Sequence, residues 1–368
     1  MNAVEILREL VAIDSTSARS NLPMIDALER HARALGFSTR RQAWTDPAGV
    51  PKANLIASRG GETGGLALVG HTDCVPFDRD WSGALRAEER EGKLFARGAA
   101  DTKAFIAAAL EAASRTSAGP LQLVFTADEE VGCLGARQLV DEGALRPRHA
   151  IVGEPTRLIP VLGHKGYCLA EIAVRGAEGH SAFPETGASA ILAAGRLLAE
   201  IERIGSQLQR ETDLQFSPPY TTLNVGLIQG GKAKNIIPGF CTLTLEWRPL
   251  PSQDLRQVLR LVEDACARLT SDRIRFEVTP QRLDRGVLVP PDAQIVRFVQ
   301  NASRQDPETI PFGTELPYLT ALGAEACVFG PGDIRVAHRT GEFVPLDELQ
   351  KAVDILAAAI DRFATSKL

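Results

Sequence analysis

The chain has 368 residues, of which 44% are hydrophobic and 24% are charged, and its formal net charge at pH 7 is −5. A chain of this length exceeds what one simple core accommodates, so two domains are expected. The acidic balance argues against a nucleic-acid partner, and the sequence has no apolar run near the roughly 20 residues of a membrane helix.

The N-terminal segment is charged and amphipathic, which predicts a helix over residues 2–12 and no signal peptide. The six cysteines are scattered and form no CxxC pair. In a chain of this size, such scattered cysteines predict reduced thiols and a cytoplasmic location. A second helix is expected over 22–35, ended by Gly36, and strands are expected over 37–41 and 53–58.

Four short apolar runs then read as buried strands, and each is followed by side chains that can bind a metal ion. These runs are 66–69, followed by His71 and Asp73; 121–125, followed by Asp128, Glu129 and Glu130; 149–152, followed by Glu154; and 326–329, followed by His338. Asp101 precedes an Ala-rich helix expected over 104–114, and residues 81–93 read as a loop. In open α/β sheets, groups just beyond the carboxyl ends of strands face the ligand crevice.

The middle of the chain has a different order of expected helices and strands. Between residues 166 and 280, the expected elements follow the order βαββαβ, which is that of a ferredoxin-like unit. We therefore expect a discontinuous catalytic domain, 1–165 and 281–368, with an inserted domain over 166–280. The predicted class is α/β, with an open mixed sheet flanked by helices and an inserted α+β domain.

Two histidines and three carboxylates are what two divalent ions need when one carboxylate is shared. Two adjacent ions can activate water and stabilise a tetrahedral intermediate. Each residue alone has an ordinary explanation, since a Glu–Glu pair is usually a solvated turn and Asp101 alone could be a helix N-cap. The joint pattern favours a metal site.

Six segments resemble the M20 metallopeptidases, the family of acetylornithine deacetylase, succinyl-diaminopimelate desuccinylase and carboxypeptidase. They run in family order across nearly the whole chain. The segments are Gly70-His-Thr-Asp-Cys-Val-Pro76, Arg97-Gly-Ala-Ala-Asp-Thr-Lys103, Thr126-Ala-Asp-Glu-Glu-Val-Gly132, Val152-Gly-Glu-Pro-Thr156, Gly179-His-Ser-Ala182 and Gly330-Pro-Gly332 with Ala337-His338.

The resemblance implies a role for each residue of the pattern. His71 and Glu154 would bind one ion, Glu130 and His338 would bind the other, and Asp101 would bridge both. Asp73 would orient His71, and Glu129 would act as general base. The ions would be Zn²⁺, with Co²⁺ as the alternative.

The inserted domain resembles the family's lid and dimerisation domain. His180 would help to stabilise the oxyanion in the partner subunit of a homodimer. Arg248 would bind the substrate's α-carboxylate, and Asn235, Gly313 and Thr314 would approach the substrate. Lys165 is expected to be a solvated lysine at a strand end. Glu315 faces either a cationic substrate side chain or water.

Within the family, the residues look most like acetylornithine deacetylases, which implies hydrolysis of N2-acetyl-L-ornithine to L-ornithine and acetate in arginine biosynthesis. The open alternatives are N-acetylcitrulline or N-acetyl-lysine deacetylase, succinyl-diaminopimelate desuccinylase, a dipeptidase on the same metal set, or a catalytically silent binding or dimerisation protein. The expected partners are a small N-acyl-amino acid and a second copy of the chain, with no nucleic acid and no membrane.

Overall fold

The computed structural model describes residues 2–364, which divide into two compact units. The first unit comprises residues 2–163, 289–308 and 314–364, and the second comprises residues 164–288 and 309–313. Within the described part of the chain, no helix combines the length and the apolar character that crossing a membrane requires.

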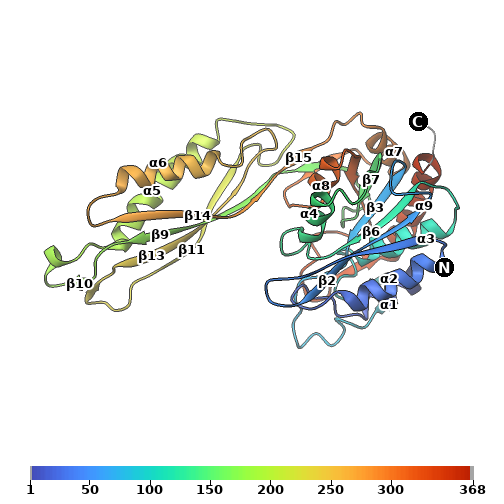
Figure 1. The fold of residues 1–368 in the computed structure, drawn as a ribbon, viewed down its shortest axis with the longest axis horizontal. Coiled ribbons are helices and arrows are strands. Elements are labelled where there is room, and N and C mark those ends of the chain that lie inside the picture. The colour runs from blue at the N-terminus through green and yellow to red at the C-terminus, as the bar shows by residue number, and fades with distance from the viewer. Residues whose placement is uncertain (1, 365–368) are drawn as a thin grey trace. The chain divides into compact units, whose positions relative to one another are not determined.

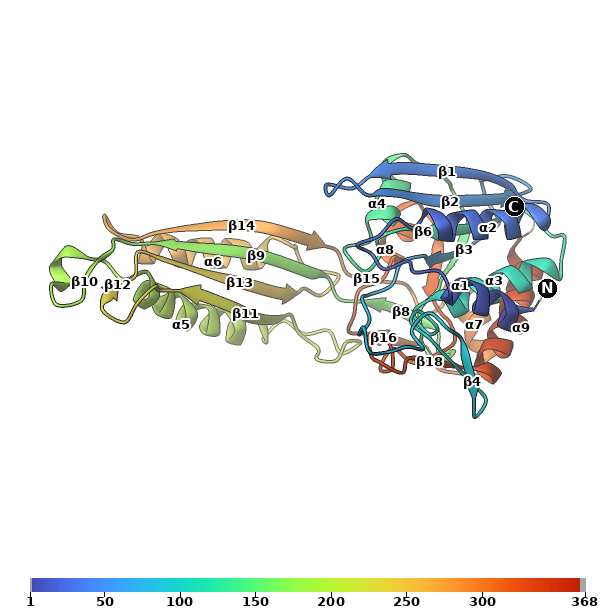
Figure 2. The ribbon, with the colours of Figure 1, turned by 90° about the horizontal axis from the view of Figure 1, so that it is seen from below.

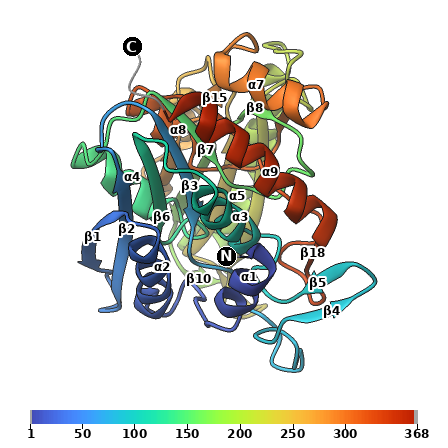
Figure 3. The same cartoon turned by 90° about the vertical axis from the view of Figure 1, so that its right-hand side faces the viewer.

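A large mixed sheet lies in the middle of the first unit, and Figure 3 shows helices flanking it. Parallel pairings join β3 to β6, β3 to β7 and β7 to β17, whereas β1, β2 and β8 pair antiparallel with their neighbours. In sheet order, the strands are β1 (Ser38–Thr45), β2 (Pro51–Arg59), β6 (Leu121–Thr126), β3 (Leu66–His71), β7 (His149–Val152), β17 (Glu325–Val328) and β8 (Val161–His164). The predicted open mixed sheet flanked by helices is confirmed.

The central strands β3, β6 and β7 are buried along their whole length. Parallel strands are covered on both faces, so their sequences read as continuous apolar runs instead of alternating ones. The parallel pairing also places the carboxyl ends of β3, β6 and β7 at one edge of the sheet. The segments that follow these strands therefore start from neighbouring positions.

Seven helices belong to the described part of the first unit: α1 (Ala3–Val11), α2 (Leu22–Ala34), α3 (Lys103–Ser114), α4 (Leu134–Asp141), α7 (Gln294–Ser303), α8 (Leu316–Ala321) and α9 (Leu346–Phe363). Helix α3 is buried over nearly its whole surface and packs against α1 and α9. Its alanines permit that close approach. Phe105 of α3 packs onto Gly153 so closely that a Cβ atom there would lie 2.1 Å from the phenylalanine ring.

A small sheet of order β18-β5-β4 also belongs to the first unit, and it was not expected from the sequence. Its strands are β4 (Glu88–Arg90), β5 (Lys93–Phe95) and β18 (Phe343–Pro345), and β16 (Glu308–Ile310) is a further short strand. The prediction of a loop over 81–93 is wrong at β4. All three residues of β4 are exposed, so this strand has no apolar alternation by which it could be recognised.

The second unit has the element order βαββαβ, and its four-stranded antiparallel sheet has the order β11-β13-β9-β14. Figures 1 and 2 show α5 and α6 side by side against one face of this sheet. Alternate residues of β9 and β13 are buried beneath the two helices. The main elements are β9 (Tyr167–Arg175), α5 (Ala190–Leu208), β11 (Thr222–Gly230), β13 (Phe240–Arg248), α6 (Gln257–Leu269) and β14 (Arg275–Asp284); shorter ones are β10 (Gly179–His180), η1 (Pro184–Thr186), β12 (Ile236–Ile237) and β15 (Val287–Leu288).

Candidate metal centre

His71 is the last residue of β3, and its imidazole is buried. Its Nε2 atom lies 3.0 Å from Oδ1 of Asp101. Its Nδ1 atom lies 3.0 Å from the backbone oxygen of Asp73 and 3.6 Å from the carboxylate Oδ1 of the same residue. The ring is thus oriented at Nδ1, and Nε2 points at the carboxylate that a metal ion would share with it.

Asp101 lies between two histidines. Its Oδ1 faces His71, and its Oδ2 lies 3.1 Å from Nε2 of His338. Burial alone would raise the pKa of Asp101, but hydrogen bonds to His338 and His71 outweigh it and hold this pKa well below its usual range. Thr102, and not Asp101, is the N-cap residue of α3. The explanation of Asp101 as an N-cap is therefore wrong, and each of its oxygens faces a different imidazole.

Glu129 and Glu130 lie in the turn after β6. The carboxylate of Asp73 holds this turn, because Oδ1 accepts the backbone N–H of Glu129 at 3.0 Å and Oδ2 accepts that of Glu130 at 3.3 Å. The Ser17 hydroxyl donates to Oδ2 of Asp73 at 2.7 Å and fixes that carboxylate in turn. Glu130 Oε1 lies 3.0 Å from His338 Nε2, whereas Glu129 Oε1 accepts a long contact from the Cys133 thiol at 3.4 Å.

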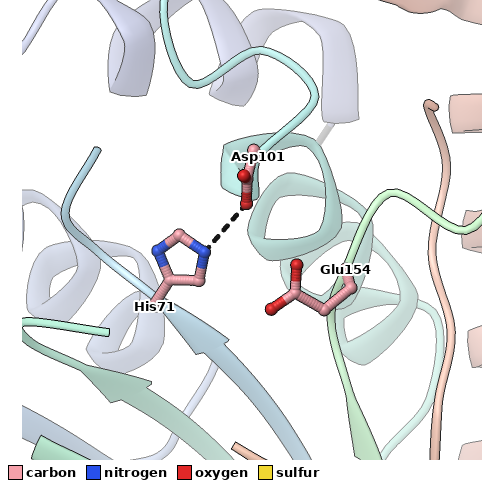
Figure 4. A group of neighbouring side chains, drawn as sticks. All are labelled: His71, Asp101 and Glu154. Carbon is pink, nitrogen blue, oxygen red and sulfur yellow. Dashed lines mark hydrogen bonds and ion pairs between the residues drawn. The ribbon is translucent and has the colours of Figure 1, made fainter. Parts of the chain in front are cut away.

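Two groups of candidate ligands emerge, and they share Asp101. Figure 4 shows the first group, in which the side chains of His71, Asp101 and Glu154 converge. The second group joins Asp101 to Glu130 and His338. Within each group, the candidate ligand atoms lie within 4.8 Å of one another. The five ligands predicted from the sequence are therefore brought together in the arrangement that a shared carboxylate requires.

The charges in this cluster fit two cations. Burial, followed by the negative charge of neighbouring carboxylates, raises the pKa of Glu154 well above its ordinary value, and burial raises the pKa of Glu130 as well. Hydrogen bonds to Asp101 and Glu130 raise the pKa of His338 to about 10. Uncompensated negative charge is therefore costly in this cluster, and divalent ions would offset it.

Glu129 lies beside the ligand cluster without belonging to either group. Burial raises its pKa to about 8, and the charges of Glu130 and Glu315 add to the effect while His71 opposes it. A carboxyl group whose pKa is close to working pH can both take and return a proton.

Two buried residues near the ligands were not singled out from the sequence. Arg97 Nη1 lies 2.5 Å from Glu342 Oε2, and both side chains are almost completely buried. The sequence offered signals for both residues, because Arg97 opens the segment that contains Asp101 and Glu342 lies four residues after His338. His338 itself lies ten residues beyond the end of β17, in a loop and with a positive φ of 59°, so it does not follow directly from the strand end.

His180, Asn235 and Arg248 belong to the second unit, whereas all five candidate ligands belong to the first. His180 is exposed on β10, and its Nδ1 accepts the N–H of Ala182. Asn235 is exposed. Arg248 ends β13, donates to Glu246 and to the backbone oxygen of Pro311, each at 2.8 Å, and is one-third exposed.

Gly313 ends the short segment 309–313 that is grouped with the second unit, and a Cβ atom there would contact nothing within 4 Å. Thr314 is buried in the first unit, and its hydroxyl accepts the N–H of Leu316 at 3.1 Å.

Lys165 and Glu315 differ from what the sequence suggests. Lys165 is buried and donates to the backbone oxygen of Tyr220 at 2.5 Å, so the prediction of a solvated lysine is wrong. Burial and the charge of Arg248 lower its pKa to about 8. Glu315 is 1% exposed, which excludes the reading that it faces water, and burial raises its pKa to about 7.

Comparison with known proteins places these observations in a family context. A family model described as Peptidase family M20/M25/M40 matches residues 67–362. An acetylornithine deacetylase from Myxococcus xanthus is 55% identical over 365 residues, which cover 97% of this chain and 96% of the relative. One from Proteus mirabilis (strain HI4320) is 34% identical over 380 residues, with coverages of 99% and 97%.

Solved structures share the fold. A tripeptidase from Staphylococcus aureus superimposes with a TM-score of 0.81 at 22% identity, covering 99% of this chain and 98% of that one. A Bacillus subtilis protein, described as a dinuclear metal-binding peptidase of the M20 family, gives a TM-score of 0.69 at 16% identity, with coverages of 99% and 98%.

Proposed function

The chain belongs to peptidase family M20/M25/M40, and from that premise we propose that it is a di-metal amidohydrolase that converts N2-acetyl-L-ornithine to L-ornithine and acetate, a step of arginine biosynthesis. The near-full-length identity of 55% to an acetylornithine deacetylase supports the substrate. The single observation that carries the proposal is Asp101, whose two oxygens face His71 and His338 at 3.0 and 3.1 Å.

In the proposed site, His71 and Glu154 would hold one ion, Glu130 and His338 would hold the other, and Asp101 would contribute to both. Zn²⁺ suits this mixed set of imidazole and carboxylate ligands, and Co²⁺ is the alternative. When bound, the ions supply Lewis acidity that activates a water molecule and polarises the acyl carbonyl. Asp73 would hold the ring of His71 through its backbone oxygen and the Glu129–Glu130 turn through its carboxylate.

Glu129 is the proposed general base. Its carboxylate takes a proton from the attacking water as the new bond to the acyl carbon forms. It then gives that proton to the departing amine nitrogen as the C–N bond breaks. The acid that forms loses its own proton, so that acetate is released together with the amine, which is protonated at neutral pH. The burial of Glu129, its place beside the ligand cluster and the anchoring of its backbone by Asp73 all support this role.

For the second unit, we propose the role of lid and dimerisation domain. Strand β11 is an edge of the four-stranded sheet, and Leu227 and Ile228 on it are 60% and 51% exposed. On α5, Leu192 is 67% exposed. An unpaired edge strand with exposed apolar side chains favours pairing with a second copy. In such a homodimer, the exposed His180 would stabilise the oxyanion in the partner's site.

The remaining roles concern substrate recognition. Arg248 would bind the α-carboxylate through its guanidinium, which is one-third exposed and stacks over the ring of Tyr167 at 4.8 Å. Asn235, Gly313 and Thr314 would contact the substrate around it. We further propose a cytoplasmic location, which the six buried free cysteines support.

A substrate panel tests the proposal. Acetate release is measured from N-acetyl derivatives of ornithine, citrulline, lysine, glutamate and methionine, and amine release is measured from N-succinyl-diaminopimelate and a dipeptide, with metal content determined on the same sample. We expect kcat/KM to be highest for N2-acetyl-L-ornithine. A higher value for another substrate would replace the proposed activity with that one, and no turnover by the metal-loaded protein would favour a silent relative.

A further inference from the structure

The buried carboxylate of Glu342, which pairs with Arg97, has contacts at both of its oxygens. Glu342 Oε2 lies 2.5 Å from Arg97 Nη1. Its Oε1 accepts the backbone N–H groups of Ala100 at 2.9 Å and of Asp101 at 3.2 Å. The backbone oxygen of Glu342 accepts the N–H of Ala96 at 3.1 Å. Both oxygens of the carboxylate are therefore occupied by the segment that carries Asp101.

These contacts join three separate ligand-bearing segments of the first unit. Glu342 lies four residues after His338, and Arg97 lies four residues before Asp101. The Nη2 atom of Arg97 also donates to the backbone oxygen of Pro76 at 3.3 Å, in the segment that follows His71. The ion pair of Arg97 and Glu342 thus connects segments that are up to 245 residues apart in sequence.

We propose that Glu342 is a positioning residue of the metal centre: it fixes the backbone of Asp101 and the loop of His338 relative to each other, so that the two ligands can share the ions. A residue behind a ligand sets the orientation of that ligand, and removing it typically lowers metal affinity 10- to 100-fold. This inference rests on the proposed di-metal function and assigns Glu342 no contact with the substrate.

The variant Glu342→Gln tests this role with minimal change in shape. The amide can still accept a backbone N–H through its oxygen, but its NH₂ group then faces the guanidinium of Arg97, and two donors repel each other. The loss of the negative charge also leaves Arg97 buried without its partner. The Asp101 segment should therefore loosen while the rest of the fold is retained.

Glu111→Gln is the matched control. Glu111 is also a buried carboxylate of the first unit, and it accepts the N–H of Ala3 at 2.6 Å and a guanidinium hydrogen bond from Arg115 at 2.7 Å. It thus has the same kind of partners as Glu342, but none of them is a candidate ligand or carries one. Glu111→Gln should destabilise the fold less, because Arg115 is 37% exposed and keeps Asp354 as a partner, and only Glu342→Gln should affect the metal centre.

The measurement is a titration of the metal-free, full-length proteins with Zn²⁺ against a chromophoric chelator, with thermal melting as the check of folding. We expect about a 10- to 100-fold weaker Zn²⁺ affinity in Glu342→Gln, and an affinity within about twofold of wild type in Glu111→Gln. With Co²⁺ as the ion, the visible absorption of Glu342→Gln should also change, since it reports ligand geometry.

A folded Glu342→Gln protein that binds Zn²⁺ with wild-type affinity overturns the inference, as does a parallel loss of affinity in Glu111→Gln. If Glu342→Gln does not fold, Arg97→Lys carries the same prediction, because lysine keeps the charge but cannot reach both Glu342 and Pro76. A wild-type protein that binds no Zn²⁺ would refute the proposed function itself, so the two failures are distinguishable.

Discussion

Glu129 and Glu130 are neighbours in the chain, yet they face different partners. Glu130 contacts His338, while the carboxylate of Glu129 contacts the Cys133 thiol and stays outside both ligand groups. The turn that separates them is held by the carboxylate of Asp73. Glu130 can therefore act as a metal ligand, while Glu129 can act in proton transfer.

The variant Glu129→Ala should lower kcat for N-acetyl-ornithine hydrolysis by about 10²- to 10⁴-fold, the usual range for loss of a general base. Metal content should stay at the wild-type level, because Glu129 is not one of the clustered ligands. Steady-state kinetics and metal analysis of one preparation check both points. Turnover near the wild-type rate would show that another group acts as the general base.

The buried carboxyl groups predict how pH affects the metal-free protein. The pKa of Glu129 is raised to about 8 and that of Glu315 to about 7, each above the ordinary value of 4.5. A carboxyl group whose pKa is raised in the folded state adds to the free energy of unfolding. This contribution is fully present below pH 4.5 and is lost as the pH rises through the raised pKa. In the metal-free protein, the contributions of both groups should therefore fade between about pH 5 and 8.

Melting of chelator-treated and metal-loaded protein at pH 6 and pH 8 checks this expectation. Bound cations stabilise the ionised carboxylates, so the difference in Tm between the two forms should be larger at pH 8, by on the order of 5 °C. A difference that is equal at both pH values, or larger at pH 6, would mean that cations do not neutralise this cluster.

At the scale of elements, the strand ends were predictable and some of the loops were not. The runs that became β3, β6 and β7 are apolar throughout, as buried parallel strands require, so the positions of His71 and Glu154 followed from them. His338 was expected beyond the fourth strand, and nine residues separate it from the end of β17. Its position depends on contacts with Asp101 and Glu130 that are distant in sequence, and no local pattern encodes them.

The packing of α3 against the strand ends gives a prediction about Gly153. A Cβ atom at this position would lie 2.1 Å from Cδ1 and 2.2 Å from Cγ of Phe105. Gly153→Ala should lower the free energy of unfolding by about 1–3 kcal/mol, as overpacking does, and should weaken Zn²⁺ binding because Glu154 is the next residue. Denaturant unfolding and metal titration measure the two effects.

Gly205→Ala is the control for Gly153→Ala. Gly205 lies within α5, where the nearest atom to an added Cβ would be 3.8 Å away. Alanine there should stabilise the protein by about 0.5–1 kcal/mol through helix propensity. If Gly153→Ala is as stable as wild type, the proposed tight contact between α3 and the Glu154 segment is wrong.

At the scale of the whole molecule, the metal ligands belong to one unit and the proposed oxyanion residue His180 belongs to the other. The order βαββαβ was evident from periodicity, because each main element of the second unit has nine or more residues. The proposed dimerisation could not be argued from periodicity, since its support comes from side chains such as Leu192 and Leu227 that the fold leaves exposed.

Mixed dimers test whether His180 acts across subunits. Glu129→Ala and His180→Ala should each be inactive alone. After co-refolding, half of the dimers contain one chain of each kind, and in these the His180→Ala chain has an intact Glu129 and receives His180 from its partner. About a quarter of wild-type activity should return. Recovery of no activity, with dimers present by sedimentation, would place His180 in the site of its own chain. An active His180→Ala homodimer would place it outside catalysis.

The proposed deacetylase activity depends on two metal ions for which Asp101 would be a common ligand. It is tested most directly by titrating the metal-free protein with Zn²⁺ while acetate release from N2-acetyl-L-ornithine is followed. We expect negligible activity without metal, binding of two ions per chain, and loss of that binding in Asp101→Asn. Full activity of the metal-free protein, or unaltered binding of two ions by Asp101→Asn, would contradict it.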